Sequence, residues 1–129
     1  MAVTQQQLTE LYLAYFGRPA DIGGIQFYTA NPANTMQSVA ANFSASPESL
    51  SLYGATFGAA QIDAIYQNLF NRNAEAAGQA YWSAEVSAGR ISSAGAALAI
   101  MQGAQNQDKV SVQNKLAIST AFVAQLDTA

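Results

Sequence analysis

Apolar residues recur at helical spacing along most of the chain. Leu8, Leu11, Tyr12 and Tyr15 stand at positions i, i+3, i+4 and i+7, which is the pattern of a helix with one buried face. The same spacing returns at Ile62, Ile65, Tyr66 and Leu69. No stretch alternates apolar and polar residues for long enough to indicate a strand. The pattern therefore predicts an all-α protein.

The two stripes belong to longer segments that resemble each other. Residues 7–30 match residues 61–84 without a gap, at a constant offset of 54. Identical pairs include Tyr12 with Tyr66 and Arg18 with Arg72, and the pairs Asp21/Glu75, Phe27/Tyr81 and Tyr28/Trp82 are chemically similar. We expect one compact multi-helix domain over residues 1–129, built from two related helical repeats at about 4–57 and 58–129.

Polar residues at the ends of the stripes predict where the helices begin and end. Thr4 with Gln7 forms a capping-box pattern, and Asp21 can cap a second short helix. The Ser46-Pro47-Glu48 sequence predicts another start, with Ser as N-cap and Pro at the first helical position. Asn71 takes the place of Gly17, because both residues tolerate a left-handed turn.

The second half differs from the first in two respects. A stripe of Ala94, Ala97, Leu98 and Met101 aligns with the first half only if about four residues are inserted near Glu85 to Arg90. The last helix, starting at Asn106-Gln107-Asp108, is longer than its counterpart and should lie across both repeats. Its predicted apolar stripe consists of Val112, Leu116, Val123 and Leu126, widened by Ile118 and Phe122.

Composition excludes several classes of function. Only 10% of the residues are charged and the net charge is −3, which argues against a nucleic-acid partner, because phosphate binding needs clustered Lys and Arg. The chain has no Cys and no His, so neither a thiolate nor an imidazole is available for catalysis or metal binding. The sequence contains no run of about 18 apolar residues, so it predicts no membrane insertion. The first residues lack the pattern of a secretory signal peptide.

Six residues are candidates for ligand binding: Arg18, Asp21, Tyr28, Arg72, Glu75 and Trp82. The two Arg/acid pairs predict either equivalent ligand sites at helix N-termini or a purely structural arrangement. In the structural interpretation, the arginine bonds loop carbonyls and the acid caps a helix. The aromatic residues Tyr28 and Trp82 could stack on sugar rings, although aromatic residues at helical spacing more often lie in a core.

No catalytic motif is present, and we expect no enzymatic activity. The sequence contains no nucleophile elbow, P-loop or dinucleotide-binding fingerprint. It also contains no calcium-binding loop of the EF-hand or RTX type, so no metal ligands are predicted. A calcium site assembled from acids distant in sequence is left open.

The segment YLAYFGRPAD at residues 12–21, followed by Gly24 and Phe27-Tyr28, resembles a helical bacterial domain of unknown function with the pattern LYxxxxGRxPDxxGxxYW. FSASPE at residues 43–48 is similar to the FxxSPE signature of that domain. The second copy keeps Tyr66, Arg72 and Trp82 but lacks the Gly-x-Pro turn and the SPE box. The chain also resembles the N-terminal anchoring region of RTX-type S-layer proteins.

This resemblance implies a module of a bacterial cell-surface protein that is exported by type I secretion without an N-terminal signal. It implies binding to cell-surface polysaccharide, such as the O-polysaccharide of lipopolysaccharide, and a possible role for Ca²⁺. The alternatives are a protein–protein assembly module, which could bind other copies of the same protein, and an intracellular scaffold. Glycan binding predicts an exposed aromatic residue in a polar groove, whereas assembly predicts a flat apolar patch.

Overall fold

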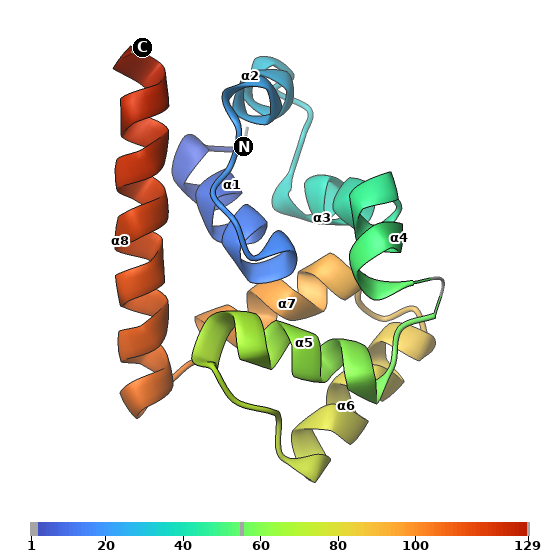
Figure 1. The fold of residues 1–129 in the computed structure, drawn as a ribbon. Helices are drawn as coiled ribbons and strands as arrows, with labels where there is room; N and C mark the ends of the chain where they lie inside the picture. The colour runs from blue at the N-terminus through green and yellow to red at the C-terminus, as the bar shows by residue number, and fades with distance from the viewer. Residues whose placement is uncertain (1–2, 55, 129) are drawn as a thin grey trace.

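All regular structure in the described part of the chain is helical. The computed structural model describes residues 3–54 and 56–128, with side chains as far as Gln125. The elements are α1 (Gln5–Leu11), the π-helix η1 (Tyr12–Phe16), α2 (Ile22–Ala30), α3 (Met36–Ser44), α4 (Pro47–Tyr53), α5 (Ala59–Phe70), α6 (Ala76–Ser87), α7 (Ser93–Gln102) and α8 (Asn106–Thr128). The prediction of an all-α protein with a long C-terminal helix is confirmed (Figure 1).

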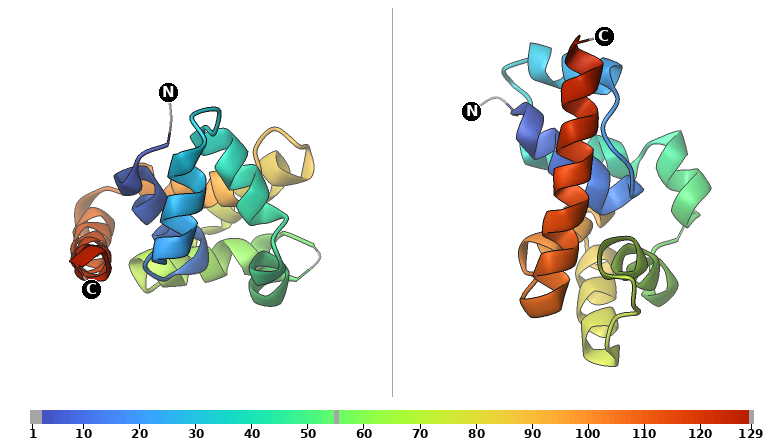
Figure 2. Two further views of the ribbon diagram at one scale, coloured as in Figure 1. Left: turned by 90° about the horizontal axis from the view of Figure 1, so that it is seen from above. Right: turned by 60° about the vertical axis from the view of Figure 1, so that its left-hand side comes forward.

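The helices surround a central rod formed by α1 and η1. This rod contacts α7, α8 and α5, and α3 packs most extensively against α7. Helices α2 and α6 lie at opposite ends of the molecule, while α8 runs along its side (Figures 1 and 2). Because α8 contacts α1, η1, α2 and α5, it lies against elements from both halves of the sequence.

Most predicted helix boundaries are confirmed by the capping contacts. Thr4 and Gln7 form the capping box of α1, and Asp21 caps α2. Ser46 caps α4, which has Pro47 in its first turn. Gly17 and Asn71 both adopt left-handed backbone geometry, with φ of 68° and 59°. The Asn in the second half thus replaces the Gly in the first half, as the sequence predicts.

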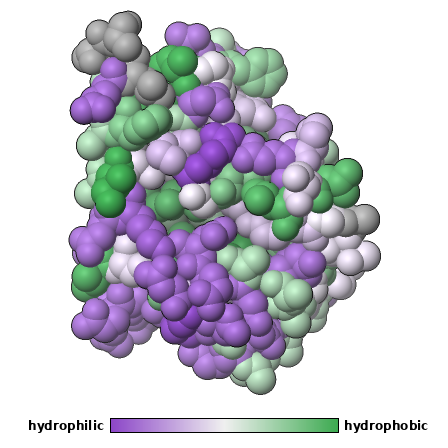
Figure 3. All heavy atoms as spheres, viewed as in Figure 1, coloured by the Kyte–Doolittle hydropathy of each residue, from purple (hydrophilic) through white to green (hydrophobic). Residues whose placement is uncertain are grey.

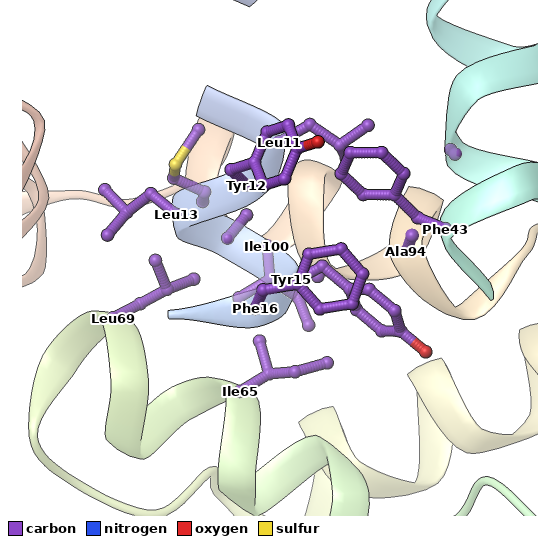
Figure 4. Packing of buried hydrophobic residues seen from close by; sticks show 14 of the residues in the cluster. Leu11, Tyr12, Leu13, Tyr15, Phe16, Phe43, Ile65, Leu69, Ala94 and Ile100 are labelled. Atoms are coloured by element: carbon purple, nitrogen blue, oxygen red, sulfur yellow. The ribbon is translucent and has the colours of Figure 1, made fainter. Parts of the chain in front are cut away.

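Both predicted apolar stripes face one shared core. All eight stripe residues are buried: Leu8, Leu11, Tyr12, Tyr15, Ile62, Ile65, Tyr66 and Leu69. Figure 4 shows side chains of the central rod surrounded by Phe43, Ile65, Leu69 and Ile100. Burial of each such side chain contributes about 1.5–3 kcal/mol. The two halves therefore stabilise each other rather than folding around separate cores.

The core also contains a polar network that connects three elements. The Tyr15 hydroxyl lies 2.5 Å from Ser49 Oγ of α4 and 2.9 Å from Ser93 Oγ of α7. The Tyr53 hydroxyl donates to the backbone carbonyl of Tyr15. Burial is the main cause that raises the pKa of Tyr53. These contacts satisfy polar groups that would otherwise be costly to bury.

The first helix contains a π-turn that its hydrophobic pattern does not predict. All five residues of η1 are buried, including Leu13, Ala14 and Phe16. A regular α-helix turns about 100° per residue and would direct some of five successive side chains toward solvent. The wider π-turn occurs where the rod is enclosed by neighbouring helices. The corresponding part of α5 is a regular α-helix, so the two halves differ here.

The predicted stripe of α8 is partly wrong. Val112 and Val123 are buried and Leu116 is half-buried, but Ile118 is 69% exposed and Phe122 is 48% exposed. At about 100° per residue, these two side chains lie on the flank of the helix rather than on its inner face. Ser119 occupies the inner face instead and is buried. The side chain of Leu126 lies outside the described residues.

Candidate functional site

Arg18 lies in the turn that follows Gly17 and is held by four kinds of contact. Its Nε and Nη2 donate to the Glu48 carboxylate at 2.8 and 2.7 Å. Its Nη1 donates to the Pro19 carbonyl at 3.0 Å and to Asp21 at 3.5 Å. The guanidinium carbon lies 4.9 Å from the centroid of the Tyr12 ring, within the range of a cation–π contact.

Arg72 makes the corresponding contacts in the second half. Its Nε and Nη2 donate to the Asp108 carboxylate at 3.2 and 2.6 Å. Its Nη1 donates to the Asn73 carbonyl and to Glu75, both at 3.0 Å. The guanidinium carbon lies 5.3 Å from the centroid of the Tyr66 ring. The two arginine clusters therefore repeat each other contact for contact.

The geometry of both clusters favours a structural role. Each arginine uses a bidentate ion pair, a carbonyl and a second acid, which leaves few N–H groups for a ligand. The hydrogen bond that Arg18 donates to Glu48 raises the pKa of Arg18, and the one that Arg72 donates to Asp108 raises the pKa of Arg72. These contacts tie each turn to the start of a distant helix, α4 or α8.

The two acids of the predicted site are not equivalent. Asp21 Oδ1 accepts from the backbone N–H of Gly24 at 2.6 Å and so caps α2. Glu75 is the N-cap residue of α6 but makes no side-chain capping bond. Asp63 instead accepts from the backbone N–H of Ala74, next to the start of α6. Asp21 thus has the capping role that the structural interpretation assigned, whereas the Glu75 side chain accepts from Arg72 and caps no helix.

The aromatic candidates Tyr28 and Trp82 are half-buried and pack against the core. The rings that face solvent are their neighbours: Phe27 is 69% exposed and Tyr81 is 56% exposed. Each exposed ring is nearly perpendicular to its half-buried neighbour, at 81° in both pairs. Phe27 and Tyr81 are therefore more exposed than the two aromatic residues preferred from the sequence. The structure places the two exposed rings on α2 and α6, at opposite ends of the molecule.

Sequence reasoning missed the roles of Glu48 and Asp108. It recognised both acids as first-turn residues of equivalent helices, but it did not connect them with Arg18 and Arg72. A usable signal was present, because each half contains one Arg after the first helix and one acid at the start of the last helix. Pairing these residues by their equivalent positions would have predicted both ion pairs.

The described part of the chain has several surface cavities. One of about 330 Å³ lies beside α4 and is lined partly by Ser44, Ser46 and Ser49. A second of about 280 Å³ lies between the Arg18 turn and α8. There the Lys115 ammonium donates to the Asn68 carbonyl, and burial lowers its pKa. A third of about 260 Å³ lies between α3 and α7.

The outer surface is mostly neutral and polar. Figure 3 shows hydrophilic side chains over α5 and α6, with separate hydrophobic patches along α8. Among residues whose side chains are described, no three acidic groups are arranged to hold a metal ion. No helix in that part of the chain is long and apolar enough to cross a membrane.

A scan against known protein families matches residues 40–110 to the Domain of unknown function DUF4214. The match covers more than half of the 129 residues, so the chain belongs to this family. It extends from α3 to the first turns of α8 and includes Glu48, the Arg72 cluster and Tyr81. No match to a curated protein or to a solved structure reaches significance.

Proposed function

We propose that this member of the DUF4214 family is a non-catalytic anchoring module of an exported bacterial surface protein of the S-layer or RTX type. It binds cell-surface polysaccharide, such as the O-polysaccharide of lipopolysaccharide, on the outside of the cell. The resemblance of residues 12–28 and 43–48 to modules of such proteins supports this proposal. A role for Ca²⁺ forms part of the proposal through the same resemblance.

The observation that carries the proposal is the exposure of Tyr81 on α6. No residue of this helix is fully buried, and the Tyr81 side chain is 56% exposed. The Tyr81 ring is fixed against Trp82, with ring centroids 4.9 Å apart. A flat ring with a polar hydroxyl offers stacking and hydrogen bonding together. Phe27 offers a similar ring on α2.

Co-sedimentation with bacterial cells tests this proposal. The purified chain is mixed with cells that display O-polysaccharide and with matched cells that lack it, each with and without Ca²⁺. We expect binding only to the first cells, and a roughly two- to tenfold loss on Tyr81→Ala. Leu52→Ala is the matched control, because Leu52 is an exposed apolar residue without a ring. Equal binding to both kinds of cell, or to neither, would refute the proposal.

A protein–protein assembly role is the second candidate, and the α8 surface supports it. Ile118 and Phe122 stand at i and i+4, so they form one exposed apolar strip. Sedimentation of the chain over a range of concentrations tests this role. Assembly predicts a larger species that Ile118→Ser weakens and that Tyr81→Ala leaves unchanged. A monomer at every concentration would argue against self-assembly.

A further inference from the structure

The cavity between α3 and α7 has apolar walls and one charged group. Its lining consists of Met36, Gln37 and Ala40 from α3, Arg90, Ile91 and Ser92 from the connection before α7, and Gly95 and Leu98 from α7. We propose that this cavity binds a small carboxylic acid with an apolar body, and that Arg90 holds the carboxylate. This inference is independent of polysaccharide binding.

The backbone fixes Arg90 at the edge of the cavity. Helix α6 ends in a Schellman motif, in which Gly89 adopts φ of 75° and donates to the Val86 carbonyl. The Arg90 N–H donates to the Glu85 carbonyl at 3.1 Å, which completes the motif. The Arg90 Nε also donates to the Glu85 carboxylate at 2.6 Å. Glu85 therefore orients the guanidinium before a ligand arrives.

The two terminal nitrogens of Arg90 remain available. Arg18 and Arg72 use theirs for acids and carbonyls, whereas Nη1 and Nη2 of Arg90 make no hydrogen bond to any described residue. These nitrogens form a planar fork that matches the two oxygens of a carboxylate. No acid lines the cavity, and the Glu85 carboxylate is bonded to Nε rather than to these two nitrogens.

The start of α7 does not supply the anion contact. The Ala94 N–H donates to Ser44 Oγ at 3.0 Å, and the Gly95 N–H donates to Ser92 Oγ at 3.1 Å. These backbone donors already have partners within the protein. Arg90 is the one charged side chain in the lining of this cavity, which makes it the decisive residue for a test of carboxylate binding.

The remaining walls select an apolar body of limited size. Met36, Ile91 and Leu98 contribute aliphatic side chains to the cavity. Gly95 keeps the space beside Ile91 open, because a Cβ at this position would lie 3.0 Å from Ile91 Cγ1. At about 260 Å³, the cavity is smaller than typical drug-binding pockets. A short aliphatic acid of about six carbons suits this volume better than a long acyl chain.

The helix that leads to Arg90 is longer than its counterpart in the first half. Helix α6 has 12 residues and α2 has 9, so the extra residues predicted near Glu85 to Arg90 lie in α6. The connections that follow these helices, residues 31–35 and 88–92, are equally long. Arg90 stands at the position that Ala33 occupies in the first connection, so the arrangement of the helices does not require an arginine there.

Nuclear magnetic resonance titration of the whole chain tests the inference, with hexanoate as the probe and hexan-1-ol as its uncharged counterpart. We expect hexanoate to shift the amide signals of Gln37, Ser92 and Gly95, and to bind about tenfold or more tightly than the alcohol. Arg90→Met removes the fork and should lower hexanoate affinity to that of the alcohol. Lys109→Met removes one positive charge from an exposed position on α8 and should have no effect.

A second variant makes the test independent of Arg90. Met36→Glu places an acid in the first turn of α3, where it suits the helix but repels a carboxylate in the cavity. It should weaken hexanoate and spare hexan-1-ol. Equal binding of the two probes would refute the carboxylate site, and the absence of shifts at the cavity would refute the cavity as a site. Retained cell binding in Arg90→Met would confirm that polysaccharide binding is separate.

Discussion

Substituting the two equivalent glycines Gly24 and Gly78 with Ala should change stability in opposite directions. Both residues stand at the third position of a helix, α2 or α6, at the sequence offset of 54. A Cβ at Gly24 would lie 2.9 Å from Asp21 Oδ1 and 3.1 Å from Tyr12 Cζ, and closer still to the Tyr12 hydroxyl. A Cβ at Gly78 would meet only the Tyr66 hydroxyl, at 3.4 Å.

These distances set the expected magnitudes. Gly78→Ala makes an ordinary van der Waals contact and reduces the entropy of the unfolded chain, so it should stabilise the protein by about 0.4–1 kcal/mol. Gly24→Ala gains the same entropy but crowds the buried Tyr12 ring. Overpacking of this kind costs about 1–3 kcal/mol, and the net result should be destabilising. Gly23→Ala is the local control, because its Cβ would contact only Asp21 Oδ1 at 3.8 Å.

Urea unfolding followed by circular dichroism at 222 nm measures these differences. The double variant Tyr12→Phe/Gly24→Ala removes the hydroxyl that causes the closest contact and should recover part of the loss. If Gly24→Ala and Gly23→Ala were equally stabilising, the close packing of α2 on Tyr12 would be wrong. If Tyr12→Phe gave no recovery, the loss would have a different origin.

Three further predictions concern polar contacts. A double-mutant cycle on Arg18→Met and Glu48→Gln, measured by urea unfolding, should give a coupling energy of about 1 kcal/mol, because the bidentate pair is partly exposed. Zero coupling would contradict a stabilising role for this ion pair. Tyr15→Phe leaves two serine partners without their hydrogen bond and should cost about 1–3 kcal/mol in thermal unfolding, whereas Tyr81→Phe should cost almost nothing. Burial raises the pKa of Tyr12 from 10.0 to about 12 in the folded protein. As the pH rises, the unfolded chain therefore loses this proton before the folded chain does. The free energy of unfolding should fall between pH 10 and 12. Alkaline unfolding of Tyr12→Phe should show a shallower fall, and an unchanged slope would contradict this assignment.

The helices and their ends follow closely from the sequence because local physics determines them. The capping residues Thr4, Asp21 and Ser46 each bond a backbone N–H three residues later, as their types and positions predict. The apolar stripes predict the core because a helical face repeats with fixed geometry. The left-handed turn at Asn71 could be predicted although Gly is replaced there, because Asn is one of the few other residue types that adopt a positive φ.

The site could not be predicted to the same extent, because it depends on contacts between distant segments. Hydrophobic spacing does not determine which neighbour of an aromatic pair turns outward, and the sequence favoured Tyr28 and Trp82 over Phe27 and Tyr81. The ion pair of Arg18 with Glu48 spans 30 residues and exists only after α4 has packed against η1. The cavity beside Arg90 likewise arises only when α3 meets α7.

The family match separates two versions of the proposed function. A binding surface that belongs to the DUF4214 domain must lie within residues 40–110, which include Tyr81 but exclude Phe27. If the function belongs to the family domain, Tyr81→Ala should reduce cell binding while Phe27→Ala leaves it almost unchanged. Equal losses would indicate that the two halves act as equivalent sites. A loss only in Phe27→Ala would place the binding surface outside the family domain, on the part of the chain that its profile does not match.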